Sequence, residues 1–130
     1  MTTTVGIVLV SHSAELVAGL HLLLKQIGSD TVPLATAGGT DDGRIGTSYD
    51  LVLAAIRRAN VGAGVIVLPD LGSSVLTART VLEDHPHPDV TLVDAPFVEG
   101  AVAAVVAAAS GADLKTVVEA AEEARNVPKF

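Results

Sequence analysis

Cysteine and tryptophan are absent from this chain of 130 residues, and aromatic side chains make up only 2% of it. Without cysteine the chain can form neither disulfides nor thiolate nucleophiles, which agrees with a cytoplasmic location. The scarcity of aromatic rings argues against a platform that stacks nucleic-acid bases. The net charge of −7 makes a polyphosphate backbone a poor ligand as well, and it favours basic protein partners instead.

The chain also lacks a basic leader and long apolar runs. Its N-terminal stretch MTTTVGIVLV carries no lysine or arginine, so it does not read as a secretory signal. The apolar run AVAAVVAAAS falls far short of the roughly 20 residues that a membrane-spanning helix requires. Hydrophobic residues nevertheless make up 49% of the sequence, which is enough for a core. We therefore expect one domain, residues 1–130, that binds neither nucleic acid nor a membrane.

Four short runs rich in β-branched residues alternate with helical patterns. The runs predict strands at 5–10, 31–37, 64–68 and 90–94, and the patterns between and after them predict helices at 13–28, 47–60, 73–84, 97–110 and 113–125. The first and third runs are almost entirely apolar, which is typical of strands buried on both faces. Pro33 places the second run at a sheet edge, because proline donates no ladder hydrogen bond. The alternation predicts an α/β fold: a doubly wound, mainly parallel sheet with helices on both faces.

Two local features of the helices are also predicted. The helix at 13–28 is expected to end at Gly28 and to bury a stripe of aliphatic side chains, namely Leu16, Leu20, Leu23, Leu24 and Ile27. Thr47 stands three residues before Asp50, a weak capping-box pattern that would open the helix at 47–60.

The residues most suited to chemistry follow the predicted strands at their carboxyl ends, where open parallel sheets bind ligands. His12 follows the first strand in VSHS, and Asp70 follows the third in PDLGSS. If these strands are neighbours, the carboxylate of Asp70 fixes one ring nitrogen of His12 and leaves the other as a nucleophile. Position alone is equally consistent with a histidine that merely ends a strand and helps to cap a helix, and the default interpretation of Asp70 is a turn or cap residue.

Small residues at the predicted helix starts indicate a phosphate cradle around His12. Ser13 opens one helix, Gly72 and Ser73 open another, and Gly39 belongs to a glycine pair after the second strand. Unpaired amides and the positive end of the helix dipole favour anions at such positions. The sequence contains no G-x-x-x-x-G-K-[ST] segment, so a nucleoside triphosphate site is not expected.

The other histidines carry weaker signals. His21 falls inside a helix and is interpreted as a structural or surface residue. His85 and His87 stand in the segment DHPHPD, which is interpreted as a solvated turn because of its prolines. Because metal-ligand spacing and cysteine ligands are lacking, we predict no metal and no cofactor. A hydrolase is disfavoured too, because the chain has no G-x-S-x-G elbow.

Taken in order, these pieces resemble the mannose-type enzyme IIA domains of the bacterial phosphotransferase system (PTS), and among them the phosphocarrier subunits of dihydroxyacetone kinase. The resemblance rests on VSHS, AGGTDDGRIGTS, DLGSS, DAPFVEGAVAA and AASGAD, and it runs over nearly the whole chain. It implies that His12 accepts a phosphoryl group and that Asp70 orients it. It also implies a sheet with strand order 2-1-3-4 and an extra edge strand, and a homodimer.

The resemblance further implies two protein partners. The small histidine phosphocarrier HPr would phosphorylate His12, and ADP on the nucleotide-binding kinase subunit would take the phosphoryl group. Because the sequence ends at Phe130 without an HPr-like domain, HPr is expected as a separate chain. Two alternatives stay open: an enzyme IIA that feeds a sugar permease, and a regulatory module whose phosphorylation state tunes the binding of a partner.

Overall fold

The structure is a computed structural model that describes residues 3–28 and 30–130. Its strands are β1 (Gly6–Ser11), β2 (Leu34–Gly38), β3 (Val65–Pro69) and β4 (Val90–Leu92). Its helices are α1 (Ala14–Ile27), α2 (Tyr49–Ala59), α3 (Ser73–Asp84), α4 (Phe97–Ala109) and α5 (Leu114–Glu123), with a short 3-10 turn, Ala124–Asn126, after α5. Every predicted strand and helix is therefore present. In the described part of the chain, no helix is long and apolar enough to cross a membrane.

The sheet is parallel throughout, with the strand order β2-β1-β3-β4. This order is the one that the resemblance implied, and β2 lies at an edge, as Pro33 predicted. Pro33 itself precedes β2, and its carbonyl accepts a hydrogen bond of 2.8 Å from the amide of Ile7. The expected extra edge strand is wrong for residues 3–28 and 30–130, which form a sheet of four strands.

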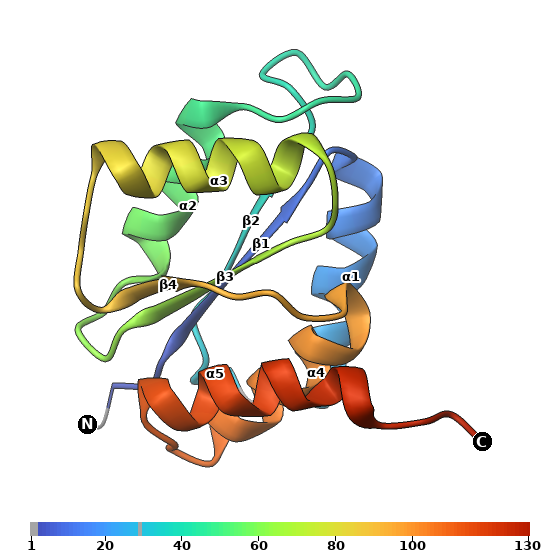
Figure 1. Ribbon diagram of the computed structural model, residues 1–130, viewed down its shortest axis with the longest axis vertical. Coiled ribbons are helices and arrows are strands. Elements are labelled where there is room, and N and C mark those ends of the chain that lie inside the picture. Colours follow the sequence, from blue (N-terminus) through green and yellow to red (C-terminus); the bar gives the residue numbers. More distant parts are fainter. Residues whose placement is uncertain (1–2, 29) are drawn as a thin grey trace.

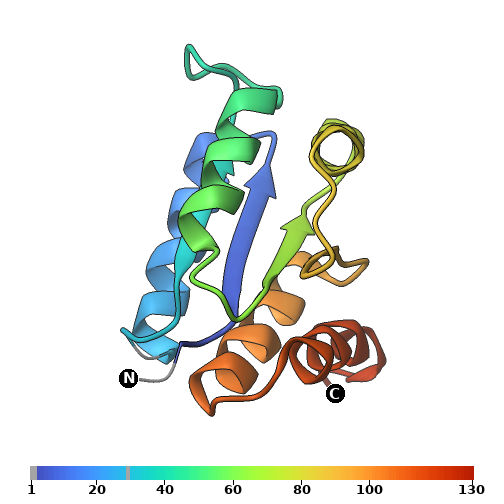
Figure 2. The same cartoon turned by 90° about the vertical axis from the view of Figure 1, so that its left-hand side faces the viewer.

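Helices cover both faces of this sheet (Figures 1 and 2). Side chains alternate across a strand, so each central strand contributes to two cores. The core shared with α1, α4 and α5 contains Ile7 and Leu9 of β1, whereas the core shared with α2 and α3 contains Val8 and Val10. All four side chains are fully buried. The doubly wound architecture is thus confirmed.

The predicted stripe on α1 is only partly right. Leu20 and Leu24 are buried, as expected, together with Val17. The remaining members of the predicted stripe are 42–47% exposed, namely Leu16, Leu23 and Ile27. The apolar side chains of α1 cover a wider arc than the sheet can bury, so these three side chains remain partly exposed.

The starts and ends of the helices follow local capping chemistry. Gly28 ends α1 as predicted, with its amide bonded to the carbonyl of Leu24. The prediction for Thr47 is wrong, because Ser48 is the cap of α2 and accepts a hydrogen bond from the amide of Leu51. A serine is an equally good cap, and its position one residue later leaves the hydroxyl of Thr47 free for another contact.

Two glycines allow helices to approach the strands closely. A Cβ on Gly6 would collide with the backbone carbonyl of Ala59 at the end of α2. A Cβ on Gly38 would lie 2.7 Å from the Cα of Ala14 at the start of α1. The first contact packs the end of α2 against β1, and the second packs the start of α1 against β2. The second contact also constrains the backbone between β1 and α1.

We predict that Gly6→Ala destabilises the fold by about 1–3 kcal/mol, because the added methyl meets backbone that cannot rotate away. Gly19→Ala is the matched control, since nothing lies within 4 Å of a Cβ at that helical position. The control should raise stability by about 0.5–1 kcal/mol. Urea unfolding of both variants measures the difference, and equal effects would contradict the close packing at Gly6.

Candidate functional site

His12 and Asp70 meet where β1 and β3 end side by side. Nδ1 of His12 lies 2.8 Å from Oδ2 of Asp70. The side chain of His12 is 30% exposed, while that of Asp70 is 4% exposed. The imidazole therefore has one nitrogen turned toward a carboxylate inside the protein while part of the ring remains in contact with solvent.

The contact between these two side chains is electrostatic in character. Nδ1 of His12 is buried, and within the described residues it makes no well-aligned hydrogen bond despite its short distance to Asp70. A carboxylate at this distance can offset positive charge that develops on the ring during a reaction. It also leaves Nε2 as the nitrogen that does not face Asp70.

Asp70 is held in place by three hydrogen-bond donors. The hydroxyl of Ser11 donates to Oδ2 at 2.8 Å, and the hydroxyl of Ser74 and the amide of Leu71 donate to Oδ1 at 2.6 Å each. Burial by itself raises the pKa of Asp70, but the donated hydrogen bonds and the nearby His12 outweigh burial and hold that pKa below its ordinary value. Asp70 is therefore ionised at neutral pH.

Ser11 and Ser74 were not identified from the sequence as site residues. Both are fully buried, and Ser11 also accepts a hydrogen bond of 3.0 Å from the amide of Ser13. Ser11 could have been identified from the sequence, because a hydroxyl at the end of an otherwise apolar strand needs a buried hydrogen-bond partner. For Ser74, the second serine of GSS, no sequence pattern distinguishes it from its neighbour Ser73.

The start of α3 is open to an anion. Its cap is Gly72, with φ +56°, and no side chain caps the helix. In the part of the chain that the structure describes, the amides of Gly72 and Ser73 donate no hydrogen bond. Two unpaired amides at the positive end of a helix dipole are suited to bind phosphate, which is the role predicted for these residues.

Ser13 and Gly39 are near His12 but are already engaged. Ser13 caps α1, where its hydroxyl accepts a hydrogen bond of 3.2 Å from the amide of Leu16. The amide of Gly39 donates to the carbonyl of Ser11 at 3.1 Å. Gly39 thus shapes the backbone, with φ +71° and no room for a Cβ beside the carbonyl of Arg44. Neither amide is free to bind a phosphate, although the hydroxyl of Ser13 still has a proton to donate.

The loop at 39–48 is attached to both sides of the site. The amide of Gly46 donates to the carbonyl of His12 at 2.9 Å. The hydroxyl of Thr47 lies 2.8 Å from that of Ser73, at the start of α3. Thr47 is thus a further hydroxyl at this edge that the sequence did not identify as a site residue. Arg44 pairs with Asp42 at 2.9 Å, with both side chains exposed.

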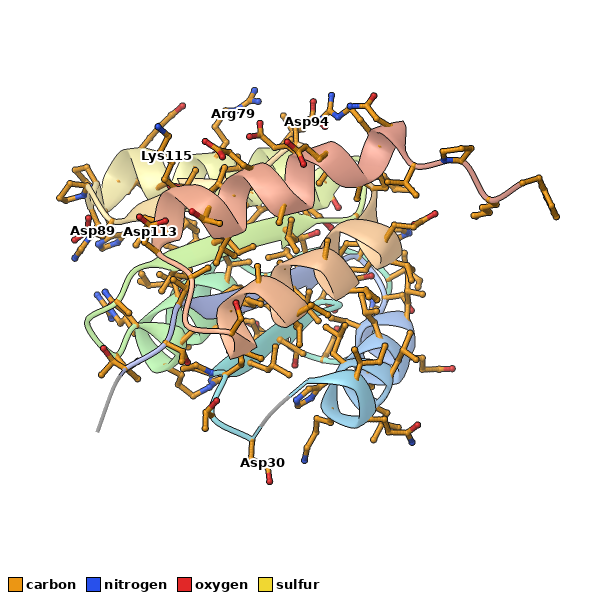
Figure 3. The ribbon with its side chains drawn as sticks, turned by 90° about the horizontal axis from the view of Figure 1, so that it is seen from below. Asp30, Arg79, Asp89, Asp94, Asp113 and Lys115 are labelled. Carbon is orange, nitrogen blue, oxygen red and sulfur yellow. The ribbon has the colours of Figure 1, made fainter. Side chains whose placement is uncertain are left out.

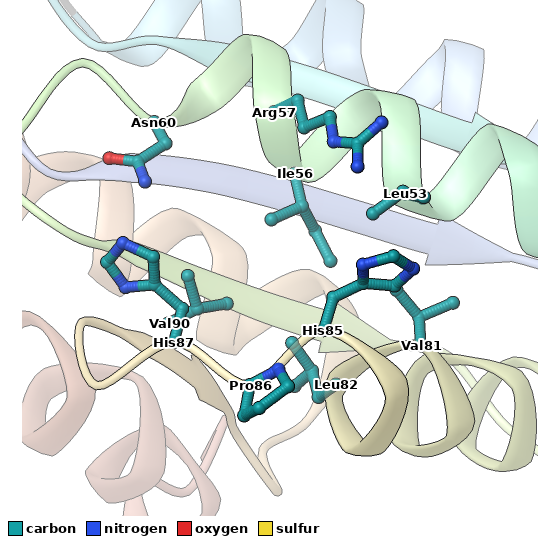
Figure 4. Close-up of a pocket in the computed structure, with 10 residues that line it drawn as sticks. All are labelled: Leu53, Ile56, Arg57, Asn60, Val81, Leu82, His85, Pro86, His87 and Val90. Atoms are coloured by element: carbon teal, nitrogen blue, oxygen red, sulfur yellow. The ribbon is translucent and has the colours of Figure 1, made fainter.

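The other histidines lie away from this edge. Burial and the neighbouring Lys25 lower the pKa of His21 on α1. His85 and His87 border a separate hollow of about 270 Å³, between the far ends of α2 and α3, that Arg57 also lines (Figure 4). Across residues 3–28 and 30–130, no three histidine, aspartate or glutamate side chains are grouped to hold a metal ion.

Comparisons with known proteins give a consistent family. The family profile EIIA-man, described as "PTS system fructose IIA component", matches residues 6–118. A protein of Listeria innocua, "PEP-dependent dihydroxyacetone kinase 1, phosphoryl donor subunit DhaM", is 42% identical over 103 residues, which cover 79% of this chain and 81% of that protein. "PTS-dependent dihydroxyacetone kinase, phosphotransferase subunit DhaM" of Lactococcus lactis is 34% identical over 92% of this chain and 95% of its own length.

The structural comparison agrees with the sequence matches. A crystal structure described as an "unknown function protein EF1359" superposes with a TM-score of 0.82 and 32% identity, over 98% of each chain. Some relatives are much longer: the match to the Escherichia coli DhaM subunit covers 88% of this chain but 25% of that protein.

The network around Asp70 makes a testable prediction about stability in acid. Because the pKa of Asp70 is lower in the folded chain than its ordinary value of 3.8, its ionised form stabilises the fold above that pH. This contribution is lost as pH falls through the folded-state pKa. Asp70→Asn should therefore cost more free energy of unfolding at neutral pH than in acid. Asp94→Asn, at a side chain that is 96% exposed, is the control and should show no such difference. Equal losses for Asp70→Asn at both pH values, measured by urea unfolding, would exclude the ionised network.

Proposed function

The chain belongs to the EIIA-man family of phosphotransferase-system IIA components, and from this premise we propose that it relays a phosphoryl group within a PTS-dependent dihydroxyacetone kinase. Residues 1–130 would act as one IIA domain. The observation that carries the proposal is the imidazole of His12, which is 30% exposed to solvent. Its Nδ1 lies 2.8 Å from Oδ2 of the ionised Asp70. The names of the relatives, phosphoryl donor or phosphotransferase subunits, support the same role.

In the first step, His12 receives the phosphoryl group from phosphorylated HPr. The lone pair of Nε2 attacks phosphorus in line, the phosphorus–nitrogen bond of the donor breaks, and its electron pair returns to the donor histidine. Nδ1 keeps its proton toward Asp70, so positive charge grows on the ring. The carboxylate, already ionised and 4% exposed, offsets that charge without rearrangement.

The phosphoryl oxygens need donors as well. The amides of Gly72 and Ser73 are unpaired at the start of α3, and the hydroxyls of Ser73 and Thr47 lie within 2.8 Å of each other beside them. Because these groups stand on the loop at 39–48 and at the start of α3, they can contact the phosphoryl group from different sides. The loose transition state of phosphoryl transfer is stabilised mainly by such positioning and charge.

In the second step, the phosphohistidine passes its group to ADP held by the nucleotide-binding subunit of the kinase. An oxygen of the terminal ADP phosphate attacks phosphorus, the bond to Nε2 breaks, and ATP forms. His12 returns to its starting state with the proton still on Nδ1. This chain would then contact HPr and the nucleotide-binding subunit with its bound ADP, but not dihydroxyacetone.

One observation favours a second candidate. The family description refers to a fructose IIA component, and such a component would pass the phosphoryl group to a sugar permease instead. The chemistry at His12 would be identical, and the acceptor protein alone distinguishes the two functions.

We predict that the chain gains one acid-labile phosphate when it is incubated with phosphoenolpyruvate, enzyme I and HPr. Intact-protein mass spectrometry measures the gain, and the ADP-loaded kinase subunit should then remove it. His12→Ala should abolish the gain, because it deletes the nucleophile. His85→Ala is the control and should label fully, since His85 lines a hollow away from the site.

Each outcome of this experiment decides between the candidates. Gain without loss to the kinase subunit would favour the permease or a regulatory role. Full labelling of His12→Ala would remove His12 from the mechanism altogether.

We also predict that Asp70→Ala slows phosphorylation of His12 by about 10²–10⁴-fold, the range typical of a positioned acid or base. Asp70→Asn should slow it as well while it keeps more of the hydrogen bonds from Ser11 and Ser74. Quench-flow labelling with phosphorylated HPr measures both rates, and circular dichroism checks the fold. Unchanged rates in folded variants would reduce Asp70 to a structural residue.

A further inference from the structure

The hollow at the ends of α2 and α3 has a wall that combines an apolar surface with a positive charge. Its volume is about 270 Å³, and α2, α3, the segment at 85–89 and the start of β4 enclose it (Figure 4). Six of its ten lining residues are apolar: Leu53, Ile56, Val81, Leu82, Pro86 and Val90. The other four are Arg57, Asn60, His85 and His87. The chain has 15 acidic and 8 basic residues, so a wall with a cation and no acid departs from the rest of the molecule.

The polar side chains of this wall have hydrogen-bond donors to spare. Within the described residues Arg57 forms no ion pair. Oδ1 of Asn60 accepts from the amide of Gly62 at 3.2 Å, which leaves the amino group of Asn60 to donate. Nδ1 of His87 accepts from the amide of Asp89 at 3.0 Å, so the neutral ring carries its proton on Nε2. A guanidinium, an amino group and an imidazole N–H therefore line one hollow.

The acidic side chains closest in sequence to the histidines of the wall face other groups. The carboxylate of Asp84 accepts a hydrogen bond of 2.8 Å from the hydroxyl of Tyr49. Figure 3 shows Asp89 near Asp113 at the start of α5, and the backbone of Asp89 and a side chain of α5 both adjoin Gly64. Neither Asp84 nor Asp89 lines the hollow. The guanidinium in the wall thus has no carboxylate beside it there.

We propose that this hollow binds a small monocarboxylate with an apolar body. Figure 4 shows Arg57 at one end of the hollow and Asn60 and His87 at the other, with Ile56 and Val90 between them. The carboxylate would pair with Arg57, whose planar guanidinium can donate two parallel hydrogen bonds to it. The apolar body would cover Ile56 and Val90. The donors of Asn60 and His87 could then bind a polar substituent at the far end of that body.

The composition and size of the hollow disfavour other occupants. A metal cation would meet the charge of Arg57 and find no carboxylate in the wall. An inorganic anion would leave the six apolar side chains in contact with water. Pockets for drug-sized ligands have volumes of about 300–1,000 Å³. The smaller volume of this hollow therefore fits a compact acid rather than a nucleotide.

The hollow and His12 lie toward opposite ends of the parallel sheet. Val90 in the wall is the first residue of β4 and pairs with Val65, the first residue of β3. His12, in contrast, follows Ser11, the last residue of β1. A ligand in the hollow would therefore leave the His12 edge accessible to protein partners. The binding of such a ligand does not depend on phosphoryl transfer, so the two functions can fail independently.

Titration of the unphosphorylated, ¹⁵N-labelled chain with phenylacetate tests this site by NMR spectroscopy. The amides of Gly62 and Asp89 report on the wall, because they donate to Asn60 and His87. Both signals should shift, with a Kd on the order of 1 mM for so small a ligand. Phenylacetamide lacks the charge and acetate lacks the apolar body. Each should bind about 10-fold more weakly than phenylacetate, because it keeps only half of the interaction.

Variants of two adjacent arginines separate a specific contact from general attraction by positive charge. Arg57→Gln should weaken phenylacetate binding by about 10-fold or more, because it removes the charge-assisted pair. Arg58→Gln is the matched control: it removes the same charge from an exposed position of α2 that does not line the hollow, and the affinity should stay unchanged. Asn60→Asp should also weaken binding, since it adds a negative charge to the wall without a change of shape. Circular dichroism checks that each variant is folded.

Several results would overturn the proposal. One is the absence of shifts at Gly62 and Asp89 with both phenylacetate and hexanoate, which share the charge but differ in body. Another is a set of shifts centred on the start of α3, which would place the anion there instead. Equal losses of affinity in Arg57→Gln and Arg58→Gln would exclude a specific pair with the wall. Equal binding of phenylacetate and phenylacetamide would show that the hollow does not recognise the carboxylate.

Discussion

The site depends on how Asp70 is held. A carboxylate that is only 4% exposed is costly unless its oxygens are satisfied. Ser11, Ser74 and the amide of Leu71 satisfy them, and they come from β1, α3 and the turn between β3 and α3. The carboxylate consequently ties a strand end to a helix start. His12, one residue after Ser11, is oriented by this arrangement and faces a charge that is already in place.

The helix starts at this edge use their serines in different ways. Ser13 caps α1 and Ser48 caps α2, so the hydroxyl of each serine accepts a hydrogen bond from an amide of the helix that it caps. Helix α3 begins on Gly72 without a side-chain cap, while Ser73 and Ser74 bond to Thr47 and Asp70. Among the described residues, the amides of Gly72 and Ser73 accordingly have no hydrogen-bond acceptor. The start of α3, which is the positive end of its dipole, is therefore suited to bind a negatively charged group.

The fold class could be predicted from the sequence, because the apolar runs of buried strands and the spacing of apolar residues in helices are local patterns. The runs at 5–10 and 64–68 predict central strands, and their pairing places His12 next to Asp70. The buried arc of α1 was not predictable in the same way, since Leu16, Leu23 and Ile27 satisfy the helical period equally well. Which leucines are buried depends on where the sheet lies. The roles of Ser11, Ser74 and Thr47 likewise depend on contacts between distant segments.

The hydrogen bond between Ser11 and Asp70 also bears on how the molecule folds. The two residues are 59 positions apart, and the β1–β3 pairing that joins them encloses β2 and two helices. Such non-local parallel pairing forms late, because the entropy of closing the chain must be overcome first. A partly folded chain that lacks β3 contains His12 without its carboxylate. The pairing of His12 with Asp70 is therefore assembled by the global folding step rather than by any local segment.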